Sequence, residues 1–151
     1  MSKLQQIELF IDIETKKLTS FQQQYQHAQQ HQHQQQKRLS DLENYRLQYL
    51  REIKSKVASG SKVNELIQYQ NFVSKLDKAC EQQVMMINQA VLVTAQRKRQ
   101  FLTQQKRVDA IAKYHDKKVK KEKLHAERIS QKQLDEVANQ YVLRRNISPF
   151  T

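Results

Sequence analysis

The sequence predicts an all-α protein: a single long antiparallel two-helix coiled-coil hairpin with an overhanging C-terminal helix. Three observations indicate this fold class. The 151 residues include one Gly and one Pro, too few for the several turns of a compact fold. Gln, Lys, Leu, Ala, Glu and Arg dominate the composition, and all of them lose little side-chain freedom in a helix. Apolar residues also recur with the seven-residue period of a helix that packs against another helix.

The first helix is predicted over residues 3–57. Alternating steps of three and four residues from Leu4 to Lys56 define sixteen positions, and eleven of them are apolar. A period of 3.5 residues is typical of a narrow seam between two helices. The polar members of this seam are Glu14, Gln32, Gln35, Arg46 and Lys56. We therefore expect a weak seam that keeps its register through few apolar contacts.

The turn is predicted over residues 58–62, around Gly60, which can adopt the positive φ that ends a helix. Ser61 and Asn64 are alternative caps for the second helix, predicted over residues 63–144 and followed by a short tail, 145–151. The whole chain, 1–151, then forms one hairpin domain. A turn at this place pairs residues whose numbers sum to about 121. Residue 3 pairs with 118, so residues 119–143 should overhang.

The charge of the chain is strongly basic and unevenly placed. The formal net charge is +12, and residues 97–132 hold thirteen Lys or Arg against four Asp or Glu. This bias indicates an acidic protein surface, a nucleic acid or an anionic membrane as partner. A solvated helix surface is the plainer alternative. Because the positive side chains surround the helix and few aromatic residues lie nearby, protein is favoured over nucleic acid.

The sequence contains no pattern for catalysis or cofactor binding. It lacks a Gly-rich phosphate loop and any nucleophile–base arrangement, and two helices offer little concavity for a reaction. We expect no enzyme activity, no cofactor and no small-molecule substrate. Residues 22–36 include ten Gln together with His27, His31 and His33. This tract is interpreted as a polar, solvated helix; a metal site and a disordered segment are the alternatives.

The overhang keeps apolar residues although it has no helix to pack against. Its stripe consists of Val119, Ala126, Ile129, Leu134, Val137 and Tyr141. Apolar side chains without an intramolecular partner often mark a binding surface. Fraying or self-association of this segment is the alternative.

Three segments carry a resemblance to a known family. Residues 42–49 (LENYRLQY) and 68–79 (QYQNFVSKLDKA) contain the aromatic residues on either side of the turn, and residues 128–136 (RISQKQLDE) lie near the C-terminus. In these segments, in length, in the position of the turn and in the basic second helix, the chain resembles the FliJ family of flagellar type III export proteins. Members of that family resemble the stalk of the gamma subunit of rotary ATPases.

The resemblance implies two protein partners, the FlhA export gate and the export ATPase. A surface for the FlhA export gate would comprise Arg38, Leu42, Tyr45, Tyr49, Phe72, Leu76, Ala79 and Gln83. The family typically has Gln and His where this chain has Arg38 and Gln83. The same residues are also expected in the seam between the helices, and the sequence leaves both roles open. From the charge and the apolar stripe of the overhang, we expect it to contact the export ATPase through Lys117, Lys118, Lys120, Lys121, Ile129, Leu134, Val137 and Tyr141.

The function implied by the resemblance is a non-enzymatic coupler between the hexameric flagellar export ATPase and the cytoplasmic region of FlhA, linked also to recycling of export chaperones. The equivalent stalk of a virulence-type secretion system is an alternative, and a basic coiled-coil protein that binds nucleic acid is another. The longest apolar run, residues 84–93, is too short to cross a membrane and is interrupted by Asn88 and Gln89. The expected location is therefore cytoplasmic, peripheral to the inner membrane at the flagellar base.

Overall fold

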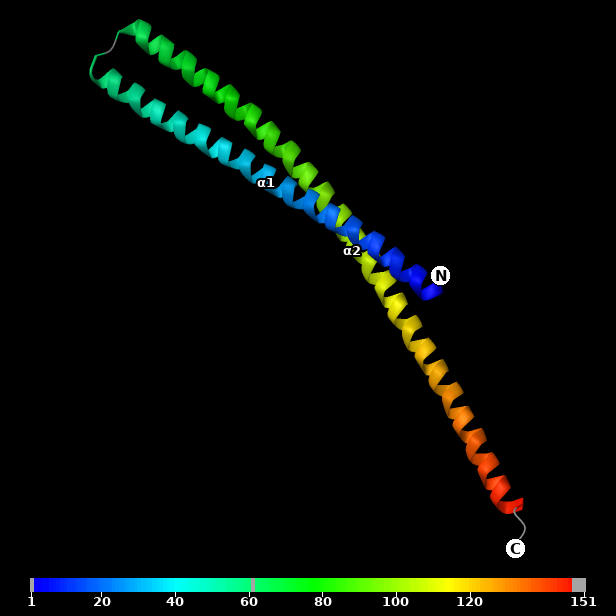
Figure 1. Ribbon diagram of the computed structural model, residues 1–151. Coiled ribbons are helices and arrows are strands. Elements are labelled where there is room, and N and C mark those ends of the chain that lie inside the picture. Colours follow the sequence, from blue (N-terminus) through cyan, green and yellow to red (C-terminus); the bar gives the residue numbers. More distant parts are fainter. Residues whose placement is uncertain (1, 61, 148–151) are drawn as a thin grey trace. The chain divides into compact units, whose positions relative to one another are not determined.

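Two helices account for nearly all of the structure. The computed structural model describes residues 2–60 and 62–147, which form α1 (Lys3–Ala58) and α2 (Val63–Ile147) (Figure 1). The described part of the chain contains no strand. The predicted all-α class and the two-helix hairpin are therefore confirmed.

The chain divides into two compact units, each containing a part of both helices. One unit comprises residues 17–104, including the turn, and the other comprises residues 1–16 and 105–151. Within each unit, α1 packs against α2 in antiparallel orientation. Gln24 contacts Arg97 and Tyr49 contacts Phe72 in the first unit, and Glu14 contacts Arg107 in the second. The numbers of each of these pairs sum to 121, the register predicted from the position of the turn.

Among the described residues, the seam between the helices contains more buried polar side chains than buried apolar ones. Every predicted seam position from Leu4 to Ile53 is buried or half-buried. Among the described residues, the buried side chains are Leu76, Ala90, Glu14, Gln35, Gln83 and Gln104. Two helices can cover only a narrow strip of each other, so few positions become fully buried. Polar residues buried in such a seam fix its register at some expense of stability.

Hydrogen bonds across the seam satisfy several of these polar groups. The Nε2 atom of Gln83 donates to the backbone oxygen of Gln35 at 2.8 Å and to its Oε1 at 2.7 Å. Thr94 donates through Oγ1 across the seam to the backbone oxygen of Ala28 at 3.1 Å, and within α2 to that of Ala90 at 2.8 Å. Because the bonds between the helices need particular partners, they oppose a shift of one helix along the other.

The turn and the helix ends differ in detail from the prediction. Gly60 has a φ of 83°, as expected for the residue that ends α1. Asn64 lies inside α2, so it is not the cap; the backbone oxygen of Lys62 accepts the first bonds of α2, from the amides of Glu65 and Leu66. Ser61 lies outside the described residues.

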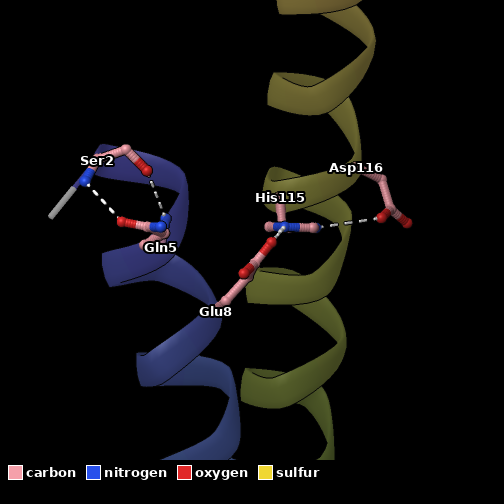
Figure 2. Close-up of polar contacts among 5 residues, drawn as sticks. All are labelled: Ser2, Gln5, Glu8, His115 and Asp116. Carbon is pink, nitrogen blue, oxygen red and sulfur yellow. Dashed lines mark hydrogen bonds and ion pairs between the residues drawn. The ribbon is translucent and has the colours of Figure 1, made fainter.

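Local interactions explain where α1 begins and where α2 ends. The Ser2 Oγ accepts from the amide of Gln5 at 3.2 Å, and the Gln5 Oε1 accepts from the amide of Ser2 at 3.0 Å (Figure 2). This reciprocal pair is a capping box that begins α1. α2 continues to Ile147, beyond the predicted end at residue 144. Arg144 and Arg145 in its last turn favour that extension, because positive charge stabilises the C-terminal end of a helix.

In its own unit, α2 extends well past the N-terminal end of α1 (Figure 1). Lys118 is the last half-buried residue, and all residues from 119 to 146 are exposed. This agrees with the expected pairing of residues 3 and 118. No helix in the described part of the chain is both long and apolar enough to cross a membrane.

Candidate protein-binding surfaces

Four aromatic side chains form a cluster near the turn, in the unit of residues 17–104. The ring of Tyr49 lies between those of Phe72 and Tyr69, with centroids 4.4 and 5.1 Å away. The ring of Tyr45 meets Phe72 edge-on, with centroids 6.0 Å apart and planes at 83°. These edge-on and tilted geometries are favourable aromatic contacts. We call Tyr45, Tyr49, Tyr69 and Phe72 the aromatic cluster.

The aromatic cluster belongs partly to the seam and partly to the surface. Tyr49, Tyr69 and Phe72 are half-buried, whereas Tyr45 is 48% exposed. On the edge of the cluster, Lys56 places its ammonium 4.6 Å from the centroid of the Tyr69 ring and donates a hydrogen bond to the Tyr69 hydroxyl. The cluster therefore holds the two helices together near the turn and still presents aromatic area to a partner.

Two groups in this region hold their protons more tightly than usual. Burial raises the pKa of the Tyr49 phenol above its ordinary value, and the nearby oxygens of Tyr69 and Tyr45 act in the same direction. The hydrogen bond to Tyr69 raises the pKa of Lys56, against a smaller opposing effect of burial. Both groups therefore keep their protonated forms throughout the neutral range.

The eight residues predicted for the gate surface divide into three levels of exposure. Arg38 and Tyr45 are exposed; Leu42, Tyr49, Phe72 and Ala79 are half-buried; Leu76 and Gln83 are buried. Arg38, Leu42, Tyr45 and Gln83 border one shallow groove together with Asp41. The structure thus brings these residues to one region, while the Gln83 side chain is occupied by its bonds to Gln35.

The residues predicted for the ATPase surface lie on the overhanging part of α2 or at its start. Lys118 is half-buried, and the other seven are exposed. Leu134, Val137 and Tyr141 follow a spacing of three and four residues and share one face of the helix. Ile129 lies five residues before Leu134, about 140° around the helix. The apolar stripe is therefore narrower than predicted, and Leu124, Val142 and Leu143 add exposed apolar area that the sequence reading did not include.

The Gln/His tract is helical throughout, since it lies inside α1. The disordered alternative for residues 22–36 is therefore excluded. His27, His31 and His33 are all exposed. Within residues 2–60 and 62–147, no group of three or more His, Cys, Asp or Glu side chains is placed to hold a metal ion.

An ion pair between the buried carboxylate of Glu14 and the exposed side chain of Arg107 is a feature that sequence reasoning missed. Glu14 occupies a predicted seam position, and its side chain is 2% exposed. Its carboxylate lies 3.3 Å from the Nε atom of Arg107, whose guanidinium also stacks over the Phe10 ring at 5.8 Å. The sequence did contain a signal for this pair. A carboxylate occupies a seam position, and the residue that the register pairs with it, since 14 and 107 sum to 121, is an arginine.

The fold defines a helical-hairpin protein with an aromatic cluster near its turn and an exposed basic helix. Comparison with protein families identifies it further: the family model described as "Flagellar FliJ protein" matches residues 2–146. The chain therefore belongs to the FliJ family, which gives it a role related to flagellar protein export. No curated protein and no solved structure matches the chain.

Proposed function

We propose that this chain is a non-enzymatic coupler in flagellar export, which binds the hexameric export ATPase and the cytoplasmic region of the FlhA export gate. The observation that carries the proposal is the presence of two different surfaces in two different units. The unit of residues 17–104 has an uncharged aromatic cluster, and the other unit has a basic helix whose residues 119–146 are exposed. Two surfaces of different chemistry suit two different partners.

The gate contact is assigned to the exposed part of the aromatic cluster. Tyr45 offers a large ring that is fixed in place by Phe72 and already desolvated on one side. Aromatic side chains of this kind contribute much of the energy of protein interfaces. Arg38 and Leu42 extend the surface along α1, and Leu76 and Gln83 support it from beneath because they are buried.

The ATPase contact is assigned to the overhang. An 85-residue helix whose last part has no helix beside it gains little from packing, so its order there depends on its own propensity and on partners. Lys117, Lys120 and Lys121 supply exposed positive charge, and Leu134, Val137 and Tyr141 supply an apolar face. A ring of subunits with acidic or polar loops at its centre is complementary to such a helix.

Export chaperones are the third class of partner that we propose, through the resemblance to the family alone. The gate is a membrane protein, so the proposed role places the chain at the cytoplasmic side of the inner membrane at the flagellar base. The proposed role involves no catalysis, cofactor or small-molecule substrate.

Two variants test the coupling role by affecting one contact each. Tyr45→Ala should weaken capture of the FlhA cytoplasmic region and leave stimulation of the ATPase unchanged. Charge reversal of Lys117, Lys120 and Lys121 to Glu should weaken stimulation of the ATPase and leave capture of the FlhA cytoplasmic region unchanged. The assays are a pull-down with purified FlhA cytoplasmic region and ATP hydrolysis by the purified ATPase. If both variants fail in both assays while remaining helical, the two surfaces are not separate sites and the proposal is wrong.

A further inference from the structure

An apolar groove lies between α1 and α2 in the unit of residues 1–16 and 105–151. It has a volume of about 480 Å³ and is lined by Lys3, Gln6, Ile7, Phe10, Ala110, Ile111 and Tyr114. Phe10 and Tyr114 are 41% and 54% exposed, so two aromatic side chains border the groove and remain open to solvent. None of the lining residues belongs to the gate or ATPase surfaces. We call this feature the N-terminal groove.

Charge is segregated around the N-terminal groove. Four exposed carboxylates of this part of the helices lie on the edge away from it: Glu8, Asp12, Asp109 and Asp116 are each two residues from a groove residue. Two residues correspond to about 200° around a helix, and so to the opposite side. Glu8 and Asp116 meet there at His115, whose ring nitrogens lie 3.2 and 3.5 Å from the two carboxylates (Figure 2).

Several positive charges lie on the groove side. Lys3 lines the groove, and Arg107 stacks on the Phe10 ring. Lys117 and Lys121 follow Tyr114 by three and seven residues, which places them on the same face of α2. The buried carboxylate of Glu14 faces Arg107 across the seam and offsets one of these charges. The remaining side chains give the groove an apolar floor with a positive border.

We infer that the N-terminal groove binds an acidic amphipathic helix of a protein partner. The lining on α1, from Lys3 to Phe10, covers about two helical turns, or roughly 10 Å. A helix of similar length can place apolar residues at spacings of three and four into the groove. Glu or Asp side chains on the flanks of that helix then face Lys3, Lys117 and Lys121.

The chemistry of the groove favours this occupant over two others. A nucleic acid would place phosphates near the lysines, but Ile7, Ala110 and Ile111 offer its bases no flat surface for stacking. A second copy of the chain, with a net charge of +12, would bring further positive charge to a positive border. The residues that line the groove belong to neither proposed partner surface, although its border shares Lys117 and Lys121 with the proposed ATPase surface. The inference does not depend on the coupling role proposed above.

The test measures binding of a synthetic helix to the full chain. The probe is a fluorescent peptide of about three turns with Leu and Phe on one face and Glu on the other, observed by fluorescence anisotropy. A second peptide has Gln in place of every Glu, and a third has Lys. We expect the acidic peptide to bind about tenfold more tightly than the neutral one, a difference of about 1.4 kcal/mol. The basic peptide should not bind.

Variants with a matched control locate the binding site. Phe10→Ala with Tyr114→Ala removes the two aromatic borders, and Leu9→Ala removes a side chain of similar exposure, 49%, that does not line the groove. Binding of the acidic peptide should fall about tenfold or more in the first variant and stay unchanged in the second. Circular dichroism confirms that both remain helical, and Lys3→Glu offers a second variant if the first unfolds.

The other outcomes overturn the inference. Equal binding of acidic and neutral peptides, or no binding of either, excludes an acidic helix as the ligand. If Leu9→Ala weakens binding of the acidic peptide as much as the double variant does, the peptide contacts another part of α1. Full competition by a DNA duplex of equal charge shows a general polyanion surface. Dimerisation that depends on Phe10 and Tyr114, measured by sedimentation, makes a second copy the occupant.

Discussion

The Nε atom of Arg107 lies 3.3 Å from the carboxylate of Glu14, which is 2% exposed and belongs to the other helix. Removing the arginine leaves a buried carboxylate with one partner fewer, so Arg107→Met should lower the free energy of unfolding by about 2 kcal/mol. The double variant Glu14→Leu with Arg107→Met removes the charge together with its partner and should recover much of this loss. Urea unfolding of both single variants and the double variant forms the required cycle. Additive effects would show that the two side chains act independently.

The aromatic cluster allows seam and surface roles to be separated by exposure. Tyr45→Ala removes a largely exposed ring and should change stability by less than about 1 kcal/mol, whereas Phe72→Ala removes a half-buried ring and should lower stability by about 2 kcal/mol or more. Tyr45→Ala with Phe72→Ala should impair binding of the FlhA cytoplasmic region more than helicity. Thermal unfolding and pull-downs of the same preparations measure both effects. Normal binding by the folded fraction of the double variant would assign these residues to the seam alone.

Gly60 has a positive φ, and a Cβ added there would meet no atom within 4 Å. Any cost of Gly60→Ala therefore comes from backbone conformation and not from a clash. We expect a loss of about 1 kcal/mol in stability, because a non-glycine residue rarely adopts this conformation. Gly60→Asn should cost less, since Asn tolerates the left-handed region better. Urea unfolding of the two variants measures the difference, and an equal cost for both would point to a cause other than φ.

Two groups near the turn make the stability of the fold depend on pH, and the direction of their pKa shifts fixes the sign of that dependence. The pKa of Tyr49 is raised above 10.0, mainly by burial, and that of Lys56 is raised above 10.5, mainly by its bond to Tyr69. The folded state therefore holds these protons more tightly than the unfolded state. Their contribution to stability is complete below pH 10 and is lost as the pH rises through the folded values.

Tyr49→Phe removes the titrating phenol and keeps the ring. Its stability should fall less steeply than that of the parent chain above pH 10. Unfolding by urea at a series of alkaline pH values gives the comparison. Parallel curves for Tyr49→Phe and the parent chain would show that the phenol contributes nothing.

The fold followed from the sequence because its signals are local and repeated. The single Gly, flanked by Ser59 and Ser61, places the turn, and the heptad frame from Leu4 fixes which side of α1 faces α2. Together these give the register, as the pairing of Tyr49 with Phe72 shows. The end of α2 was predicted less accurately, because the residues around position 144 include no strong helix-ending signal before Pro149.

The candidate surfaces were harder to predict, because exposure depends on three-dimensional packing. Gln83 and Tyr45 were assigned to the same surface, yet Gln83 turns into the seam and bonds Gln35, while Tyr45 stays half-exposed. The sequence alone could not distinguish these outcomes. The N-terminal groove was missed for a related reason, since its lining comes from residues about 100 positions apart that only the register brings together.

The overhang provides the last prediction. Residues 119–146 are exposed on all sides and keep Leu134, Val137 and Tyr141 on one face. A helix without tertiary packing is marginally stable in water, so we expect a partner to stabilise it. Deleting residues 119–151 should abolish stimulation or assembly of the ATPase hexamer while the remaining hairpin stays folded and still binds the gate.

Charge reversal at Lys117, Lys118, Lys120 and Lys121 should weaken the same contact and reduce its dependence on salt, because fewer opposite charges then meet across the interface. ATP hydrolysis measured across a salt series tests both variants, and circular dichroism with a gate pull-down controls for folding. Full stimulation by the deletion variant would move the ATPase contact from the overhang back to the paired helices.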